Sequence, residues 1–280
     1  MITTRTIDLA EPAHQRTQQE TDQDPTRGRV MYHEAGSGPP VVFLHGIGAG
    51  GMQFAPQLDG LAAAGYRVIA WDMPGYGGSS PLPLVSIDAL TATLGAFLAG
   101  LGFDRPVIVG HSLGGMLLLR LLSVAPHAAG SAVLSQTSAA FGSRDPAWAR
   151  QFVADRMAPL DEGRSMADLA HGMVAGMVGD APDAAGLALA EQGIAATPDS
   201  TYREMVLAMP GFDQRDALAH IAVPTLVVAG SRDTNAPAPG MERMAARIPR
   251  AKYVCIEGAG HLVHLEQPAR FNAVLTEFLA

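Results

Sequence analysis

The stretch Val107-Ile108-Val109-Gly110-His111-Ser112-Leu113-Gly114-Gly115 is the part of the sequence that predicts the fold. It begins with a short apolar run, passes through the pattern Gly-x-Ser-x-Gly, and continues into the apolar run Met116–Leu122. Short apolar runs that end at glycine are typical of buried strands, whereas longer ones are typical of helices. The pattern therefore predicts a strand, a sharp turn that carries Ser112, and a helix. Gly110 and Gly114 suit the crowded backbone of such a turn.

On both sides of this stretch, short apolar runs alternate with longer segments of helical character. Further strands are expected at Val30–Glu34, Val41–Leu44, Arg67–Trp71, Ala132–Ser135, Thr225–Ala229 and Tyr253–Ile256. Helices are expected at Met52–Ala64, Ile87–Gly100, Gly114–Val124 and Gly240–Arg247. Because the strands alternate with helices and several strands are apolar throughout, we expect an α/β protein with a doubly wound, mostly parallel sheet.

The composition divides the chain into three regions. Residues 1–28 are polar and lack apolar periodicity, so we expect a poorly ordered N-terminal extension there, with docking on the body of the protein as the alternative. Residues 29–135 and 213–280 carry the strands and helices of the α/β core. Residues 136–212 show no strand pattern, and their helical patches are Ala147–Met157, Met166–Val178 and Ala184–Ala195. An all-helical insertion between two strands of such a sheet predicts a lid over the carboxyl edge of the sheet.

Charge and composition exclude several classes of function. The formal net charge is -8 and the 19 basic residues are scattered, so we expect no nucleic-acid partner. No apolar run reaches the roughly 18 residues of a membrane span, and the first residues lack the apolar segment of a secretory signal. We therefore expect a cytoplasmic protein without a membrane partner. Cys255 is the one cysteine, so no intramolecular disulfide can form, and a buried, inert thiol in a strand is expected.

Nucleophilic chemistry at Ser112 requires a base, because a serine hydroxyl is a weak nucleophile until its proton is removed. Of the nine histidines, His261 is preferred, since it follows a strand through the Gly-rich loop Glu257–Gly260. Such loops at the carboxyl ends of strands carry ligand-facing residues in open α/β sheets. His264 is the local competitor. The two histidines could suggest a metal site, but no Glu or Cys partner stands at ligand spacing.

An acid that orients the base is expected after another strand. Asp233 follows the strand Thr225–Ala229 and precedes His261, and the chain order Ser, acid, His is one of those that such triads use. In this role Asp233 would fix the tautomer of the imidazole and stabilise the imidazolium that forms during attack. The alternatives are an Asp that only forms a turn, or one that pairs with the adjacent Arg232.

A tetrahedral intermediate also needs two hydrogen-bond donors for its oxyanion. One candidate is the main-chain N–H of Leu113, at the amino end of the helix that follows Ser112. The other is the main-chain N–H of Ile47, in the Gly-rich loop after the strand Val41–Leu44. A plain turn is the alternative for His45–Gly51. This chemistry needs no metal and no organic cofactor.

Four motifs stand in order along the chain, namely His45-Gly46, Asp72–Ser79, Gly110–Gly115 and Gly258–His261. Together they resemble the α/β-hydrolase fold superfamily, in its branch of single-domain esterases, lactonases and haloperoxidase-like enzymes. The resemblance runs from about Arg29 to the end of the chain. It implies acyl transfer to water through Ser112, His261 and Asp233, and a structural role for Asp72–Ser79.

The segment Phe212–Gly230 is similar to 3-oxoadipate enol-lactonases. Ser112 separates the chain from haloalkane dehalogenases and epoxide hydrolases, which resemble it elsewhere but carry Asp at this position. The carbon–carbon hydrolases of ring-cleavage pathways usually have a more Gly- and Pro-rich oxyanion loop, and Asn before the serine. Ile47 and His111 depart from both of those patterns.

The expected partner is a small ester or lactone, either neutral or singly charged. Specificity should lie in the lid and in Met52, Met116, Phe141 and Trp148. Residues 136–212 contain 5 Arg, no Lys and 10 Asp or Glu, which does not favour a dianionic substrate unless an arginine such as Arg144 or Arg203 turns inward. The methionines of this region are expected to fill helix cores, with an adaptable apolar pocket as the alternative. They are Met157, Met166, Met173, Met177, Met205 and Met209.

Two other functions stay open on the sequence. One is hydrolysis of a carbon–carbon bond in a vinylogous diketone, and the other is a ligand receptor that uses the hydrolase fold. A receptor would show slow single turnover and ligand-dependent partner binding. No partner-docking surface is visible in the sequence, and a homodimer is left open as the assembly.

Overall fold

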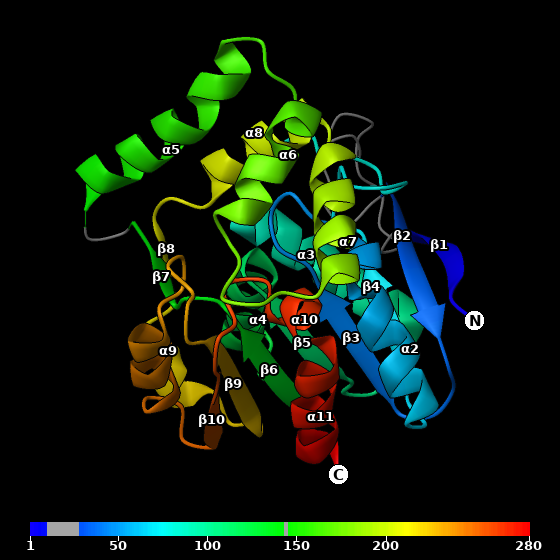
Figure 1. Cartoon of the computed structure of the whole chain (residues 1–280). Coiled ribbons are helices and arrows are strands. Elements are labelled where there is room, and N and C mark those ends of the chain that lie inside the picture. The colour runs from blue at the N-terminus through cyan, green and yellow to red at the C-terminus, as the bar shows by residue number, and fades with distance from the viewer. Residues whose placement is uncertain (10–27, 143–144) are drawn as a thin grey trace, which may run out of the picture.

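An eight-stranded sheet runs through the centre of the computed structural model, which describes residues 1–9, 28–142 and 145–280 (Figure 1). In spatial order its strands are β1 (Thr3–Leu9), β2 (Gly28–Ala35), β4 (Arg67–Trp71), β3 (Pro40–Leu44), β5 (Val107–His111), β6 (Ser131–Ser135), β9 (Thr225–Gly230) and β10 (Ala251–Ile256). From β4 to β10 all neighbouring strands are parallel. The strand β2 is antiparallel to both of its neighbours, β1 and β4. The expected doubly wound, mostly parallel sheet is confirmed.

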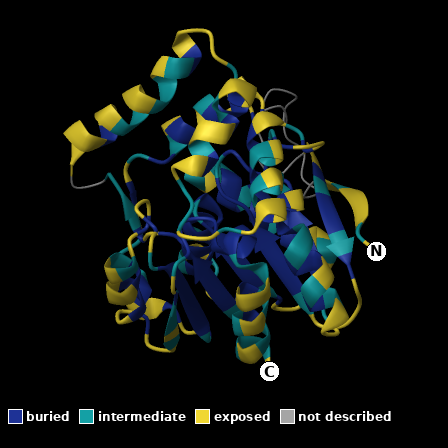
Figure 2. Cartoon of the chain, viewed as in Figure 1, coloured by how far each residue is buried: buried dark blue, intermediate teal, exposed yellow. Residues whose placement is uncertain are grey.

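Helices cover both faces of this sheet, and the central strands alternate between the two resulting cores. In β3, Val42 and Leu44 face one core while Val41 and Phe43 face the other. The first core contains residues of α3 (Ile87–Leu101), α4 (Leu113–Val124) and α9 (Ala238–Ala245). The second contains residues of α2 (Ala55–Ala63) and α11 (Pro268–Leu279). Burial on both faces explains why these strands are apolar throughout. The buried strands form the interior seen in Figure 2.

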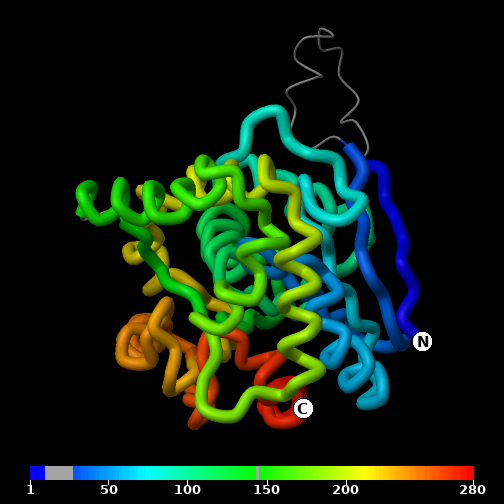
Figure 3. The backbone as a smooth tube through the Cα atoms, turned by 45° about the horizontal axis from the view of Figure 1, so that its top comes forward, coloured from blue at the N-terminus to red at the C-terminus, as the bar shows by residue number. Residues whose placement is uncertain are grey.

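The chain between β6 and β9 forms a group of helices at one end of the molecule (Figures 1 and 3). They are α5 (Pro146–Asp161), α6 (Met166–Ala175), α7 (Ala184–Ala195) and α8 (Asp199–Ala208). A buried cluster that includes Val174, Ile194 and Tyr202 joins the last three of these helices, and Leu160 at the end of α5 contributes to it, while the rest of α5 extends outward. The expectation of no strand in this region is wrong at one point, because β7 (Ala140–Phe141) pairs with β8 (Phe212–Asp213). Two-residue strands are too short for any alternation to be visible. The role of this helical segment as a lid stays a prediction.

The expectation of poor order is wrong for residues 3–9, which form the edge strand β1 and pair with β2, so this part of the extension docks on the body. Only Leu9 is buried in this strand, and Ile7 packs partly against the core. The apolar signal was therefore weak, and the main-chain ladder to β2 decides the conformation. Residues 10–27 of the expected extension lie outside the described residues.

Shorter elements connect the layers. They are η1 (Gly51–Phe54), η2 (Leu218–His220) and α10 (Val263–Glu266). Cys255 lies on β10 as expected, but it is only partly buried, because β10 is an edge strand of the sheet. In the described part of the chain, no helix combines the length and the apolar character that a membrane crossing requires.

Candidate active site

Three loops bring the predicted side chains together at the carboxyl ends of neighbouring strands. Ser112 stands between β5 and α4, Asp233 follows β9, and His261 follows β10. Because β5, β6, β9 and β10 are consecutive parallel neighbours in the sheet, their carboxyl ends meet at one edge. Residues that are up to 149 positions apart in the sequence therefore come within hydrogen-bond distance.

Ser112 occupies a strained backbone position, with φ 51° and ψ −117°. Its N–H donates to the carbonyl of Ser135 at 3.0 Å, and Thr137 Oγ1 donates to the Ser112 carbonyl at 2.7 Å. Gly110 and Gly114, on either side of Ser112, have no room for a side chain. A Cβ on Gly114 would lie 2.2 Å from the Leu44 carbonyl oxygen. The sharp turn predicted from the sequence is thus held on all sides, as persistent strain requires.

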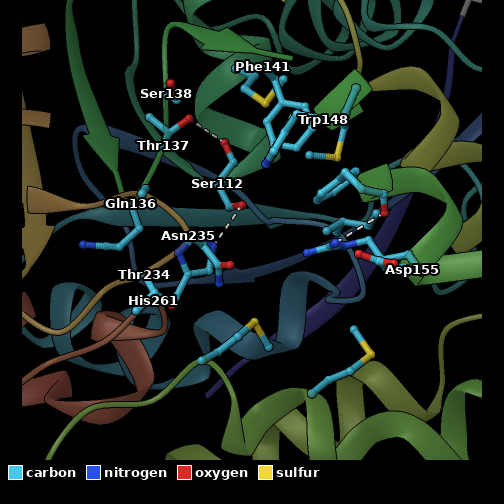
Figure 4. Close-up of a pocket in the computed structure, with 18 of the residues that line it drawn as sticks. Ser112, Gln136, Thr137, Ser138, Phe141, Trp148, Asp155, Thr234, Asn235 and His261 are labelled. Carbon is cyan, nitrogen blue, oxygen red and sulfur yellow. Dashed lines mark hydrogen bonds between the residues drawn. The ribbon is translucent and has the colours of Figure 1, made fainter. Parts of the chain in front are cut away.

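A chain of two hydrogen bonds links the three side chains. His261 Nε2 accepts from Ser112 Oγ at 3.1 Å, as the dashed line in Figure 4 marks. His261 Nδ1 donates to Asp233 Oδ2 at 2.8 Å. The other carboxylate oxygen of Asp233 accepts the N–H groups of Asn235 at 2.8 Å and Ala236 at 3.0 Å. Every oxygen of this buried carboxylate therefore has a donor.

The environment keeps Asp233 ionised. Burial by itself would raise the pKa of this carboxyl, but the hydrogen bond and charge of His261 and the two main-chain donors outweigh burial and lower the pKa. Arg232 does not pair with Asp233; it pairs with Asp180 at 3.0 Å. The alternative reading of Asp233 as an ion-pair partner of Arg232 is therefore wrong. Asp233 does form a turn, because its Oδ1 accepts the N–H groups of Asn235 and Ala236, but its Oδ2 in addition accepts from His261.

The loop that carries His261 is anchored by buried polar groups. The carboxylate of Glu266 accepts the N–H groups of Gly260 at 2.9 Å and of Leu262 at 3.0 Å, on either side of His261. The ring Nε2–H of His111 donates to the His261 carbonyl at 2.9 Å. The His261 N–H donates to the Met177 carbonyl at 2.6 Å, which ties this loop to the helical segment.

His264, the competing histidine, lies elsewhere. It is only 1% exposed, packs against Phe54 and Phe271, and neither ring nitrogen has a hydrogen-bond partner within the described residues. Burial lowers the pKa of its imidazole well below the ordinary value. Among the residues that the structure describes, no group of three or more His, Cys, Asp and Glu side chains is arranged to hold a metal ion. Of the two histidines, His261 alone contacts Ser112.

The loop 45–51 is held by a second buried network. His45 Nδ1–H donates to the Gly46 carbonyl at 2.8 Å, and its Nε2 accepts the Met73 N–H at 2.9 Å. Burial lowers the pKa of His45 to about 4, so the ring is neutral, as these two bonds require. Asp72 accepts the Gly51 N–H at 2.7 Å. The motif Asp72–Ser79 therefore supports this loop, which agrees with a structural role.

The two main-chain groups assigned to an oxyanion both lie next to Ser112. Ile47 lines the cavity that contains Ser112, and Leu113 begins α4 directly after it. Within the described residues, neither main-chain N–H donates to another protein group. Both groups are thus available to a ligand, although their assignment as oxyanion donors stays a prediction.

A cavity of about 330 Å³ opens beside Ser112 and His261. Met116, Phe141 and Trp148 line it, as expected, and Figure 4 shows Phe141 and Trp148 together on one side of Ser112. Met52 is a correction. It does not line the cavity, because η1 turns its side chain outward to 41% exposure while the next residues are buried.

The methionines of the helical segment divide between two environments. Met173, Met177 and Met209 line the cavity. Met166 is buried in the core of the helical segment and Met157 packs against it, while Met205 is buried in the first core of the α/β domain. Both the core interpretation and the pocket interpretation therefore apply, each to different residues.

One face of α5 also lines the cavity and was not predicted. Its lining residues are Gln151, Phe152, Asp155 and Arg156. From Trp148 they follow at intervals of 3, 4, 7 and 8 positions, which is the spacing of one helix face and was visible in the sequence. Arg203, by contrast, pairs with Asp161 and does not line the cavity, and Arg144 lies outside the described residues.

The family model described as "alpha/beta hydrolase fold" matches residues 39–268. Among curated proteins, the pimeloyl-[acyl-carrier protein] methyl ester esterase of Xanthomonas campestris pv. campestris is 29% identical over 257 residues, covering 88% of this chain and 96% of that protein. The 3-oxoadipate enol-lactonase 1 of Acinetobacter baylyi is 28% identical over 244 residues, covering 86% and 88%. The resemblance to esterases and enol-lactonases noted in the sequence is confirmed.

Two further comparisons differ in what they show. The chain is 30% identical over 263 residues to polyketide synthase ThaQ of Burkholderia thailandensis, but it spans only 12% of that protein. Among solved structures, a thermophilic esterase from Thermogutta terrifontis superposes with a TM-score of 0.82, with 98% of both chains covered and 24% identity. At that identity the likeness establishes the fold.

Proposed function

The chain belongs to the α/β-hydrolase fold family, and on that premise we propose that it is a serine hydrolase that cleaves a small carboxylic ester or lactone. The observation that carries the proposal is the continuous hydrogen-bond chain from Ser112 through His261 to Asp233, with Ser112 and His261 open to a cavity. An oriented base with its own buried carboxylate is the arrangement that nucleophilic serine chemistry needs.

In the proposed reaction, Ser112 Oγ attacks the ester carbonyl while His261 Nε2 takes the hydroxyl proton. The C–O bond of the ester then breaks, and His261 returns the proton to the departing alcohol oxygen. The acyl group is left on Ser112. Water, activated by the same histidine, attacks this acyl-enzyme and releases the carboxylic acid and the free serine. Throughout, Asp233 keeps His261 in the tautomer whose Nε2 faces the serine.

The oxyanion of each tetrahedral intermediate would accept hydrogen bonds from the main-chain N–H groups of Leu113 and Ile47. Leu113 is the first residue of α4, so the helix amino terminus adds a favourable dipole. Loss of one such donor typically costs a factor of about 10² to 10³ in rate. Both donors are main-chain groups, so side-chain substitution would not remove them.

The proposed substrate is small because the cavity is small. A volume of about 330 Å³ lies at the lower end of ordinary ligand pockets. The wall formed by α5, α6 and α8 would act as the lid and would select the acyl or alcohol group. Trp148 and Phe152 of α5 contact each other and Phe141 of β7, which favours an apolar group there.

Steady-state hydrolysis tests the proposal directly. We would assay p-nitrophenyl acetate, butyrate and octanoate and a panel of small lactones with the wild type, Ser112→Ala and Ser123→Ala. Ser123 lies on the same helix α4 but outside the cavity, so it is the matched control. We expect Ser112→Ala to lose activity by about 10⁵-fold or more, and Ser123→Ala to keep wild-type activity. A fluorophosphonate probe should add its mass to the wild type at Ser112 only.

Absence of turnover on every ester and lactone, in protein whose folding is verified by circular dichroism, would contradict the proposal. The same panel should then include a ring-fission diketone. Faster cleavage of that compound than of any ester would indicate the carbon–carbon hydrolase. Ligand binding without turnover would indicate the receptor.

A further inference from the structure

Among the residues that the structure describes, Arg156 is the one arginine or lysine that lines the cavity. It stands on α5, among the residues that line the same cavity as Ser112 and His261. Its side chain is partly buried. The other arginines that the sequence suggested for this role, Arg144 and Arg203, are respectively outside the described residues and paired with Asp161.

Arg156 differs from the other partly buried arginines of the described chain. Those others each form an ion pair with a carboxylate. They are Arg67 with Glu34, Arg120 with Asp88, Arg203 with Asp161, and Arg215 with Asp213. Arg156 has no carboxylate within 4.0 Å among the described residues, and its one hydrogen bond is a long one, 3.4 Å, to the Phe152 carbonyl. A guanidinium that loses water without gaining an acid is costly unless a ligand supplies the anion.

The guanidinium is nevertheless held in place. Its central carbon lies 3.5 Å from the centroid of the Phe152 ring, a stacked cation–π contact. Phe152 in turn packs against Phe141 and Trp148, at ring distances of 4.7 and 5.4 Å. The flat face of the guanidinium is thus occupied by an aromatic ring, while most of its N–H edge has no protein acceptor. That edge is the part that binds a carboxylate with two parallel hydrogen bonds.

A second donor faces the same cavity. Tyr202 lines it from α8, and within the described residues its hydroxyl has no hydrogen-bond partner. Burial raises the pKa of this phenol, so the hydroxyl keeps its proton. Burial likewise lowers the pKa of Arg156, yet a guanidinium stays charged at neutral pH. The wall therefore offers a fixed cation and a neutral O–H donor to one ligand group.

The neighbouring acid does not fill this position. Asp155 also lines the cavity, but it is exposed and accepts a hydrogen bond from Gln151 Nε2 at 2.6 Å. It does not contact the Arg156 guanidinium within ion-pair distance. Its negative charge lowers the affinity of the cavity for an anionic ligand, but Asp155 does not itself pair with Arg156. A singly charged ligand group therefore fits better than a doubly charged one.

We propose that Arg156 is the specificity residue for a carboxylate carried by the substrate, so that the preferred ester or lactone bears one carboxylate away from its scissile carbonyl. This inference rests on the proposed function, since the anion belongs to the molecule that Ser112 attacks. Phe152 would orient the guanidinium, Tyr202 would donate to the same carboxylate, and the aromatic wall would contact the apolar chain between the two ends of the substrate.

Binding without hydrolysis tests the subsite on its own. The probes are monoethyl adipate, which is anionic, and ethyl 6-amino-6-oxohexanoate, its neutral terminal amide of equal length. Ser112→Ala removes turnover, and Trp148 in the wall reports occupancy by fluorescence while Trp71 is fully buried. We expect the Ser112→Ala protein to bind the anion about tenfold or more tightly than the amide. Adding Arg156→Gln should abolish this preference, and adding Arg156→Lys should restore part of it.

Hydrolysis by the otherwise wild-type enzyme supplies the second measurement. The ratio of kcat/KM for the anion over the amide should fall about tenfold in Arg156→Gln. It should rise a few fold in Asp155→Asn, because a repulsive charge is removed. Arg150→Gln is the matched control: Arg150 lies on α5 but is exposed and outside the cavity, so the ratio should not change.

The possible failures are distinct. Equal binding of both probes by Ser112→Ala, or an unchanged ratio in Arg156→Gln, overturns the inference and leaves the serine hydrolase standing. An equal fall in Arg150→Gln also overturns it, because general charge attraction would then explain the preference. If the wild type hydrolyses neither probe nor any simple ester, the proposed function fails, while an Arg156-dependent preference in binding would keep the anion subsite.

Discussion

The strand-end loops and the α5 wall face each other across one cavity, yet they are built in opposite ways. In the loops, Ser112, Asp233 and His261 have hydrogen-bond partners that fix each of them, and the surrounding residues are buried. In the wall, α5 buries only Ala149 and Leu160, and much of its surface is exposed in Figure 2. In the proposed hydrolase, the sheet would therefore preorganise the reacting groups, while selectivity would depend on a helix that is less buried.

The largest expected effect on activity comes from a substitution in the strand-end loops, Asp233→Asn. Asp233→Asn keeps the size of the side chain but no longer holds His261 in the tautomer that accepts from Ser112. We expect kcat/KM for p-nitrophenyl butyrate to fall by roughly 10³- to 10⁴-fold, with little change in KM. Thermal unfolding of the variant is the control for structure. A loss of less than tenfold would contradict the role assigned to Asp233.

The same Gly→Ala change should act with opposite sign at the Ser112 turn and in the helical segment between β6 and β9. In Gly114→Ala the new Cβ would lie 2.2 Å from the Leu44 carbonyl oxygen, so the turn must shift, and we expect a loss of about 1–3 kcal/mol in the free energy of unfolding. In Gly172→Ala, within α6, the Cβ meets no atom within 4 Å. Helix propensity then predicts a gain of roughly 0.5–1 kcal/mol. Urea unfolding measures both, and destabilisation of similar size in both variants would remove the contrast.

The pH dependence of stability tests the loop region, because the buried, neutral histidines His45, His111 and His264 lie in or next to these loops. The folded pKa of His264 is well below the ordinary value, and those of His45 and His111 are about 4 and about 3. Below about pH 6.5 these histidines become protonated in the unfolded chain but stay neutral in the folded chain. The free energy of unfolding should therefore fall as pH drops from 6.5 towards 4, by about 1.4 kcal/mol per pH unit for each such histidine.

His264→Leu isolates one of these contributions. The ring of His264 has no hydrogen-bond partner to lose within the described residues. Urea unfolding between pH 7.5 and 5 should show a shallower loss of stability than in the wild type, while hydrolysis at pH 7.5 stays within a few fold. An unchanged pH slope would mean that this imidazole is not neutral in the fold.

The smallest expected effect lies in the wall. Trp148 is 46% exposed and contacts Phe141 and Phe152. Trp148→Ala should raise KM for p-nitrophenyl octanoate about fivefold, in line with the ~1 kcal/mol of an aromatic contact, with kcat nearly unchanged. Trp148→Phe should lose less. A large fall in kcat would show that the wall also positions the reacting groups.

The sequence by itself was sufficient for seven of the eight strands of the sheet and for the three residues at its carboxyl edge. Each of the seven expected strands is present. The central ones are apolar runs buried on two faces, which gives them the clearest signal. Ser112, Asp233 and His261 follow three of those strands directly. Once the strands are parallel neighbours, their loops must meet, and the contacts follow from the topology.

Tertiary structure alone decided the rest of the site. Of the described arginines of the helical segment, Arg156 lines the cavity and Arg203 does not, because packing between helices decides which face of α5 turns inward. The same holds for Met52, which a one-turn helix turns towards solvent, and for β1, where main-chain hydrogen bonds stabilise an otherwise polar strand. Local sequence patterns indicate which residues are buried and where the chain turns. Which of several similar polar side chains lines the cavity depends on contacts between segments that are far apart in the chain.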